Sequence, residues 1–128
     1  MSDILDRPYK MIESDLRKKF AKSMDKLGVF FQAIESGSTG VGIPDAFIQL
    51  KKKCAWVEFK TVPAKNSSNF VRPEWQEGQI PWALEYKLHG GTWFLVVAVG
   101  DKVFYSKESK DSYRKDELTP IANFMNDL

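Results

Sequence analysis

The sequence contains only one cysteine, Cys54, and only one histidine, His89. One cysteine excludes an internal disulfide framework and a zinc site built on several thiolates, and it fits a reducing compartment. One histidine argues against histidine-rich nuclease sites and against a Ser-His-Asp hydrolase. Because Cys54 has no histidine in its sequence neighbourhood, we expect a small buried apolar residue and not a nucleophile. His89 comes just before Gly90-Gly91, which predicts a position at the C-terminal end of a helix.

Long apolar runs and a large excess of one charge are also missing. No stretch of about 18 apolar residues occurs, and no charged start followed by an apolar middle indicates a signal peptide. We therefore expect a soluble, cytoplasmic protein with no membrane partner. The net charge of +2 is a small difference between 19 basic and 17 acidic residues, so it identifies no partner. The 128 residues, 43% of them apolar, are enough for one core, and residues 1–128 are expected to form a single domain.

The expected fold class is α/β, with the element order α-β-β-β-α-β-β-α. Apolar residues recur at helical spacing from Met11 to Leu27, and Gly28 ends that helix. A second helical region starts at Pro73, breaks near Gly78 and Pro81, and continues as the main helix over 79–89. Residues 108–115 form a loop, and 116–127 form a closing helix. β-branched, aromatic and alternating patterns predict strands at 29–34, 46–50, 55–62, 92–99 and 102–107.

The stretch from Gly42 to Lys60 concentrates charged residues inside two apolar strands that Lys51-Lys52-Lys53 joins as a hairpin. Side chains two apart on a strand share a face, so Glu58 and Lys60 point the same way. Charged groups at such positions are costly unless they are paired, hydrated or bound to a metal. Asp45 alone could be a turn residue, and Glu58 with Lys60 a surface pair. Together the three favour a functional site.

The glycine-rich loop 35–42 precedes Asp45. It lacks the Gly-Lys-Ser/Thr of a phosphate-binding loop, and no helix follows it. We therefore expect a flexible loop that delivers Asp45 to the site.

These motifs resemble those of the PD-(D/E)XK nuclease superfamily. Pro44-Asp45 matches the first half of the motif, and Glu58-Phe59-Lys60 matches the second half after a short hairpin. Within the superfamily the chain is most similar to phage-type VRR-NUC nucleases and their Holliday-junction-resolvase relatives. That similarity includes Ser36-Gly37, the run Gly42-Ile43-Pro44-Asp45, and a glutamine of the second helical region, Gln76 or Gln79. The resemblance covers roughly residues 11–105, and it implies a restriction-endonuclease-like core with a central mixed sheet of about five strands flanked by helices.

Phosphodiester hydrolysis adds negative charge to an anionic phosphate, so a divalent cation held by oxygen ligands is a natural stabiliser. Asp45 and Glu58 are the expected ligands of Mg²⁺, with Mn²⁺ able to substitute. The resemblance implies the backbone carbonyl of Phe59 as a further ligand, and Glu13 as the holder of a second metal or of a ligand water. Lys60 could orient or deprotonate the attacking water or neutralise developing charge. Gln79, or Gln76, would hydrogen-bond the water or the phosphate.

DNA contacts are expected from dispersed cations that reach phosphates and read no base sequence. The candidate nucleic-acid-binding residues are Lys51, Lys52, Lys53, Lys65, Arg72 and Gln76, with Arg17 and Lys18 as weaker candidates. For the lysines, a solvated surface position is the favoured interpretation, and contact with phosphates is the alternative. Trp75, beside Arg72, is read mainly as a core residue, with stacking on a displaced base as the alternative.

The expected function is therefore a metal-dependent DNA endonuclease that is structure-selective, for Holliday junctions or other branched DNA, or weakly sequence-selective. A homodimer is expected by analogy, because symmetric cutting takes two active sites. If the chain is phage-encoded, its compartment is the host cytoplasm. The alternative is a non-catalytic nucleic-acid-binding or assembly module that kept the fold. The choice among duplex, flap, single-stranded and four-way DNA stays open, as does DNA against RNA.

Overall fold

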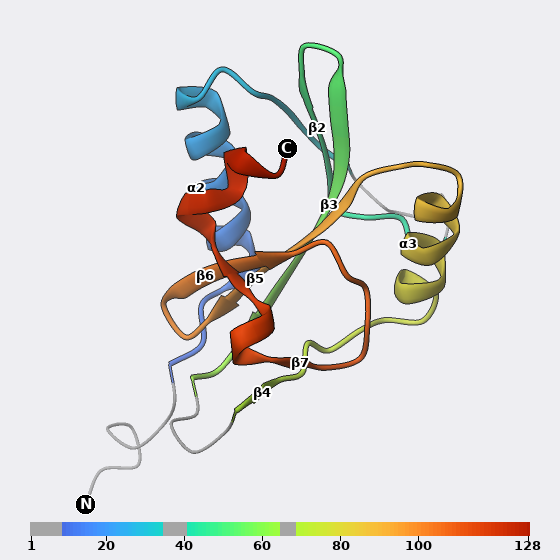
Figure 1. The fold of residues 1–128 in the computed structure, drawn as a ribbon. Helices are drawn as coiled ribbons and strands as arrows, with labels where there is room; N and C mark the ends of the chain where they lie inside the picture. The colour runs from blue at the N-terminus through green and yellow to red at the C-terminus, as the bar shows by residue number, and fades with distance from the viewer. Residues whose placement is uncertain (1–8, 35–40, 65–68) are drawn as a thin grey trace, which may run out of the picture.

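The structure is a computed structural model that describes residues 9–34, 41–64 and 69–128. Its centre is a six-stranded mixed sheet in the order β1-β2-β3-β5-β6-β8 (Figure 1). β3 and β5 run parallel, and the other neighbours in the sheet are antiparallel. The strands are β1 (Phe30–Ala33), β2 (Ala46–Leu50), β3 (Lys53–Val62), β5 (Trp93–Val99), β6 (Lys102–Ser106) and β8 (Thr119–Pro120).

The connection from β3 to β5 carries a short strand and a helix. β4 (Phe70–Val71) leaves the main sheet and pairs with β7 (Tyr113–Arg114) as a separate two-stranded sheet. Helix α3 (Gln79–Leu88) follows β4 and lies across the sheet from helix α2 (Glu13–Lys26) in Figure 1. A parallel pair needs such a crossover, so the two central strands are joined through the elements that cover one face.

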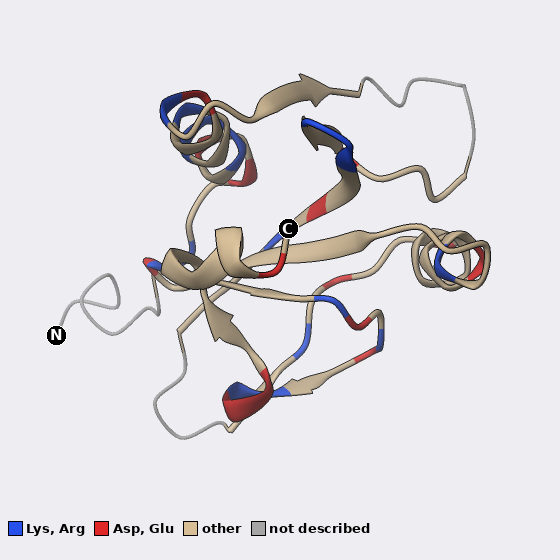
Figure 2. Ribbon diagram, turned by 45° about the horizontal axis from the view of Figure 1, so that its top comes forward, with Lys and Arg blue, Asp and Glu red and all other residues tan. Residues whose placement is uncertain are grey.

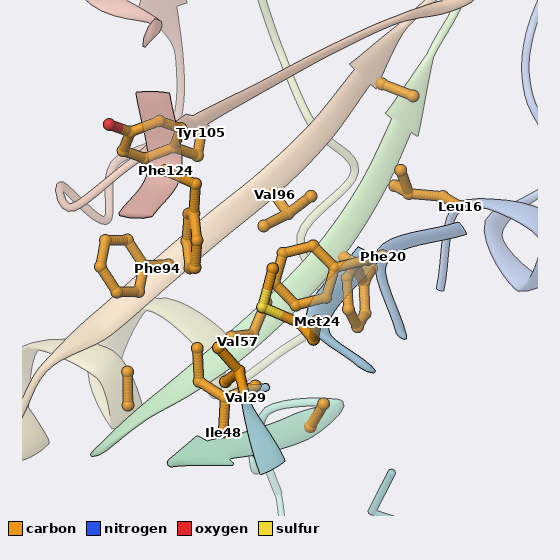
Figure 3. Packing of buried hydrophobic residues seen from close by; sticks show 14 of the residues in the cluster. Leu16, Phe20, Met24, Val29, Ile48, Val57, Phe94, Val96, Tyr105 and Phe124 are labelled. Atoms are coloured by element: carbon orange, nitrogen blue, oxygen red, sulfur yellow. The ribbon is translucent and has the colours of Figure 1, made fainter. Parts of the chain in front are cut away.

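Helix α2 covers the other face, with the 3₁₀ segment η2 (Ile121–Asn126) beside it. Leu16, Phe20 and Met24 lie three or four residues apart and form the buried stripe of α2. The Phe20 and Phe59 rings pack edge to face with centroids 5.4 Å apart. The Phe124 ring of η2 packs against the Phe94 ring with centroids 4.6 Å apart (Figure 3). This aromatic packing fixes α2 and η2 to the sheet.

Side chains alternate between the two faces of the sheet along β3, and this alternation determines on which face Glu58 and Lys60 lie. Val57 and Phe59 belong to the core under α2, whereas Val62 belongs to the second core, under α3. Glu58 and Lys60 have the parity of Val62, so they lie on the α3 face, and the expected common face of the two is confirmed.

The prediction is wrong at the C-terminal end. Residues 116–127 do not form one continuous α-helix. Two short 3₁₀ helices, η1 (Lys115–Glu117) and η2, are separated there by the strand β8. Pro120 explains the difference, because a proline lacks the N–H donor that a continuing helix needs, and it pairs at the sheet edge with Phe104. The expected sheet of about five strands gains β8 as a sixth, and the loop predicted at 108–115 contains β7.

Three local predictions are also corrected. The second helical region does not start at Pro73 but at Gln79, because Gly78 has φ of 87°, which no right-handed helix contains. Lys53 belongs to β3 and not to the hairpin turn. Cys54 is exposed and not buried, because it lies opposite exposed Gln49 near the turn of the β2–β3 hairpin. His89 does cap α3 as expected, with Nδ1 2.9 Å from the carbonyl oxygen of Glu85.

Within the described ranges, none of the helices is both long enough and apolar enough to cross a membrane.

Candidate active site

Two carboxylates lie side by side on neighbouring strands. Ala46 pairs with Val57, so the next step of the antiparallel register sets Asp45 beside Glu58. Side chains opposite each other in such a pair have Cβ atoms about 4.5–5.5 Å apart. Asp45 Oδ2 accepts a hydrogen bond from the backbone N–H of Phe59 at 2.9 Å, and the Asp45 carbonyl accepts one from Ile34 N–H at 2.8 Å. Asp45 is therefore fixed between β1 and β3, although it precedes the regular part of β2.

Lys60 is a buried cation on the same face as Glu58. Its side chain is 8% exposed, and Nζ donates a hydrogen bond to the carbonyl oxygen of Glu74 at 2.8 Å. Nζ also lies 5.4 Å from the ring centroid of Trp75. The segment before α3 therefore orients the ammonium group, and two of its three N–H donors remain for other acceptors.

Gln79 forms a hydrogen bond with Glu58 through its side chain, and the backbone of Gln76 holds the Gln79 side chain. Gln79 Nε2 donates to Glu58 Oε2 at 3.1 Å, and Gln79 Oε1 accepts from the backbone N–H of Gln76 at 2.8 Å. Gln79 is 8% exposed and opens helix α3. Of the two glutamines that the sequence left open, the structure places Gln79 at the site and the Gln76 side chain at the surface.

Burial and charge act together on Glu58, which is only 2% exposed. Burial, the charge of Asp45 and a hydrogen bond with Asp45 raise the pKa of Glu58 to about 10, and Glu13 adds to the increase. Lys60 opposes it. Partial burial and the charge of Asp45 likewise raise the pKa of Glu13, again opposed by Lys60. The three carboxylates therefore belong to one electrostatic site. We call Glu13, Asp45 and Glu58 the carboxylate cluster.

The carboxylate cluster fits a divalent cation. Glu58 is buried and lies beside Asp45, so a cation between the two carboxylates would relieve the repulsion between their charged forms. Mg²⁺ usually takes one or two protein carboxylates and keeps several waters. In the described part of the chain no three His, Cys, Asp or Glu side chains form a ready metal cage.

Two glycines bring the Asp45 segment against the start of α3. Gly42 and Gly78 both have positive φ, 85° and 87°. A Cβ atom on Gly42 would lie 2.1 Å from the carbonyl oxygen of Gly78, and that oxygen accepts the N–H of Trp82 in the first turn of α3. This close backbone contact sets the position of Asp45 relative to Gln79.

The Gly42→Ala variant is expected to be less stable than wild type. The alanine adds strain of about 1–2 kcal/mol at positive φ and a further cost of about 1–3 kcal/mol because backbone must move. Gly28→Ala is the matched control, since Gly28 has φ of 75° and a Cβ there meets no atom within 4 Å. Urea denaturation would measure both variants. Equal losses of unfolding free energy would contradict a role for the close contact.

The predicted DNA-contacting residues do not form one patch. Figure 2 shows basic residues on α2, at the β2–β3 turn and around the two-stranded sheet. Lys51 and Lys52 lie at the turn, and Glu58 lies five positions, roughly 16 Å, along β3 from Lys53. Lys53 Nζ donates to the carbonyl oxygen of Leu128 at 3.2 Å, so it also has a structural contact. Arg72 is exposed and lies close in sequence to Glu74. Lys65 and Ser36-Gly37 fall outside the described residues.

Sequence reasoning missed Glu74, Gly42 and Gly78 as parts of the site. Glu74 acts through its carbonyl oxygen, which no side-chain pattern identifies. Gly42 belongs to the run of four residues that ends at Asp45, but its role depends on a contact with Gly78, which is distant in the sequence. Trp75 was considered for base stacking. Its ring packs 6.2 Å from that of Trp93 and lies near the Lys60 ammonium group.

No protein-family model matches this chain, and neither does any curated protein sequence. Among solved structures, the chain is similar to Hjc, a Holliday junction resolvase from the archaeal hyperthermophile Archaeoglobus fulgidus. The two share 8% sequence identity with a TM-score of 0.63, over 87% of this chain and 98% of Hjc. At this identity the likeness establishes the fold, which is the restriction-endonuclease-like fold expected from the sequence.

Proposed function

We propose that this protein is a divalent-metal-dependent DNA endonuclease of the PD-(D/E)XK type, selective for branched DNA. The observation that carries the proposal is the convergence of Asp45, Glu58 and Lys60 on one face of a sheet whose fold matches that of a Holliday junction resolvase. Raised pKa values and buried charge are typical of catalytic positions. The closer likeness to phage-type VRR-NUC nucleases stays a prediction.

Asp45, Glu58 and the backbone carbonyl of Phe59 are the proposed ligands of Mg²⁺ or Mn²⁺. When bound, the cation would offset the charge that develops on the phosphate and acidify a coordinated water. The chain itself contributes the orientation of these ligands. Phe59 N–H holds one oxygen of Asp45, and Gln79 Nε2 holds one oxygen of Glu58, so each carboxylate keeps an oxygen free of these two bonds.

Lys60 is proposed to donate a hydrogen bond to the attacking water or to a phosphate oxygen. Its contact with the Glu74 carbonyl fixes the ammonium group while leaving donors for the substrate. Glu13, from the first turn of α2, would accept a proton from a water in the outer shell, because its raised pKa makes it a better base than an exposed glutamate.

Branched DNA is the proposed substrate because the candidate cations are dispersed and contact phosphates without reading bases. Hjc is a Holliday junction resolvase, which supports the same choice by analogy. Symmetric cutting of a four-way junction takes two sites, so a homodimer is proposed with it.

The proposal is tested by incubating the protein with labelled linear duplex, flap and four-way junction in Mg²⁺, Mn²⁺ or chelator. We expect metal-dependent cutting, fastest on branched DNA, and paired nicks at the junction from a dimer. The Asp45→Asn variant should cut on the order of 10²–10³-fold more slowly, because it removes a ligand charge and keeps the side-chain shape.

Asp25→Asn is the matched control, since Asp25 is exposed near the C-terminal end of α2. If the folded wild type binds these DNAs equally with and without metal and cuts none of them, the nuclease assignment fails. The non-catalytic binding module would then be the better description.

A further inference from the structure

A pocket lies on the same face of the sheet as Glu58 and Lys60. Its volume is about 360 Å³, within the range of about 300–1,000 Å³ common for small ligand sites. The mechanism above does not use it. The pocket, called the side pocket below, is lined by Val62, Pro63, Phe70, Val71, Arg72, Val99 and Lys115.

The side pocket begins one step along β3 from Lys60. Val62 follows Lys60 by two residues, so the two side chains share a face and lie roughly 6.5 Å apart along the strand. Arg72 reaches the pocket from the segment that continues to Glu74, whose carbonyl oxygen binds Lys60 Nζ. A chain of nucleotides cut at the carboxylate cluster would therefore place a neighbouring nucleotide at the side pocket.

The lining combines an apolar interior with an aromatic ring and two cations. Val62 and Val71 are buried, whereas the Phe70 side chain is 50% exposed. Arg72 and Lys115 are exposed, and none of the seven lining residues is acidic. Aromatic rings beside cations are the combination that binds single-stranded nucleic acid, because bases stack and phosphates pair with the charges.

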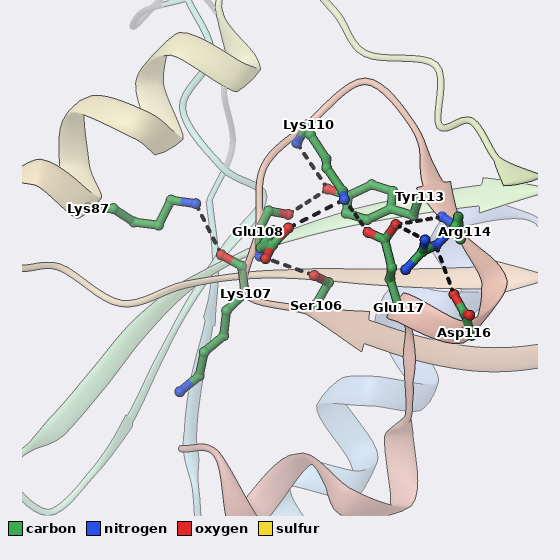
Figure 4. Close-up of polar contacts among 9 residues, drawn as sticks. All are labelled: Lys87, Ser106, Lys107, Glu108, Lys110, Tyr113, Arg114, Asp116 and Glu117. Atoms are coloured by element: carbon green, nitrogen blue, oxygen red, sulfur yellow. Dashed lines mark hydrogen bonds and ion pairs between the residues drawn. The ribbon is translucent and has the colours of Figure 1, made fainter.

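The two-stranded sheet holds this wall in place. Phe70 and Val71 of β4 pair with Arg114 and Tyr113 of β7, and Lys115 N–H donates to the Asn69 carbonyl at 2.9 Å. Figure 4 shows the polar contacts around Tyr113 and Arg114 of β7. Tyr113 O–H donates to the Glu108 carbonyl, and Lys110 pairs with Glu117.

Arg114 is tied to acidic side chains, in contrast to Arg72. Its Nε lies 3.2 Å from both Asp116 Oδ1 and Glu117 Oε1, so its charge is largely compensated. For Arg72, no ion pair is found with another described residue. Arg72 therefore presents the less compensated arginine charge at the side pocket, where a phosphate could approach it.

We propose that the side pocket binds an unpaired nucleobase of the DNA strand, stacked on Phe70, with the flanking phosphates on Arg72 and Lys115. This inference rests on the proposed function and narrows its substrate to DNA that has an unpaired or frayed nucleotide next to the cleaved phosphate. A fully paired base cannot enter, because its ring faces are covered by its neighbours in the duplex.

The test measures binding in chelator, where no cleavage occurs. The probes are two duplexes that share the strand carrying a single 2-aminopurine. That base is unpaired in one duplex and paired in the other. The readout is the fluorescence of 2-aminopurine, which stacking quenches. Phe70→Leu should weaken binding of the unpaired probe about tenfold and abolish its quenching, while binding of the paired probe stays within about twofold. Phe70→Trp should restore both, since it keeps an aromatic face.

Phe30→Leu is the matched control, because Phe30 is also an exposed phenylalanine, at 58%, but lies on the edge strand β1. Arg72→Gln and Lys115→Gln should weaken both probes and each lower the slope of log affinity against log salt by about one. The inference is overturned if Phe70→Leu affects the two probes equally or neither of them, or if the two cation variants leave the salt slope unchanged.

Cleavage separates this inference from the proposed function. Suppose that wild type cuts branched DNA with metal, but Phe70→Leu keeps its DNA binding and its preference for the unpaired probe. The proposed role of the side pocket is then wrong, and the proposed nuclease function stands. If wild type cuts no DNA but binding of the unpaired base still depends on Phe70, the proposed nuclease function is wrong, and the side pocket stands as a binding site.

Discussion

The Glu58→Gln variant is expected to cut DNA on the order of 10²–10³-fold more slowly than wild type and yet to unfold at a higher temperature in chelator. Activity falls because an amide is a poor metal ligand and carries no charge to hold the cation. Stability rises because Glu58 is buried beside Asp45 and its pKa is raised to about 10, so folding at neutral pH must protonate it, and an amide avoids that cost. The amide oxygen can still accept the Gln79 hydrogen bond, so the fold should be kept.

Two measurements on one preparation check this result: single-turnover cleavage of the best substrate and a thermal melt with chelator. Glu85→Gln is the control, because Glu85 is exposed on α3 and lies 3.9 Å from His89 at its own helix end. It should leave both quantities nearly unchanged. A Glu58→Gln protein that cuts as fast as wild type would remove Glu58 from the catalytic set.

Raising the pH in chelator is expected to destabilise the wild-type protein, and Mg²⁺ is expected to reverse the loss. The pKa of Glu58 is raised from an ordinary value of 4.5 to about 10 in the folded state. Below pH 4.5 both folded and unfolded forms are protonated, and the stability contribution is complete. Between pH 4.5 and about 10 the unfolded form ionises first, so the contribution is lost as pH rises.

The slope from one such group is at most about 1.4 kcal/mol per pH unit, and Glu13 acts in the same direction. Thermal melts at pH 6, 7 and 8 with chelator should therefore show a falling midpoint that is much flatter in Glu58→Gln. With Mg²⁺ the midpoint of wild type should rise most at pH 8, since a cation competes with the proton for Glu58. Parallel pH curves for wild type and Glu58→Gln would show that Glu58 does not carry the effect.

The central strands were predictable because their pattern is local. Glu58 and Lys60 interrupt an apolar run at alternate positions, and alternation on a strand determines which side chains share a face. The antiparallel register then follows from a short hairpin, which is why Asp45 could be placed near Glu58 before the structure was known.

Other features depend on contacts between distant segments. The choice of Gln79 over Gln76 follows from the left-handed conformation of Gly78, which sets the start of α3. The Lys60 contact with the Glu74 carbonyl has no signature in side-chain types. The wrong prediction of a helix at residues 116–127 could have been avoided locally, because Pro120 lies inside that range and disfavours a continuous helix.

The contact between Gly42 and Gly78 also constrains the order in which the native state can assemble. Gly42 precedes β2, whereas Gly78 ends the segment that crosses from β3 towards β5. A chain that has formed only the β2–β3 hairpin brings Asp45 and Glu58 together but lacks the amide of Gln79 that holds Glu58. Pairing of sequence-distant parallel strands is slow compared with hairpin formation. High-affinity cation binding should therefore appear late in refolding, and it would report completion of the β3–β5 crossover.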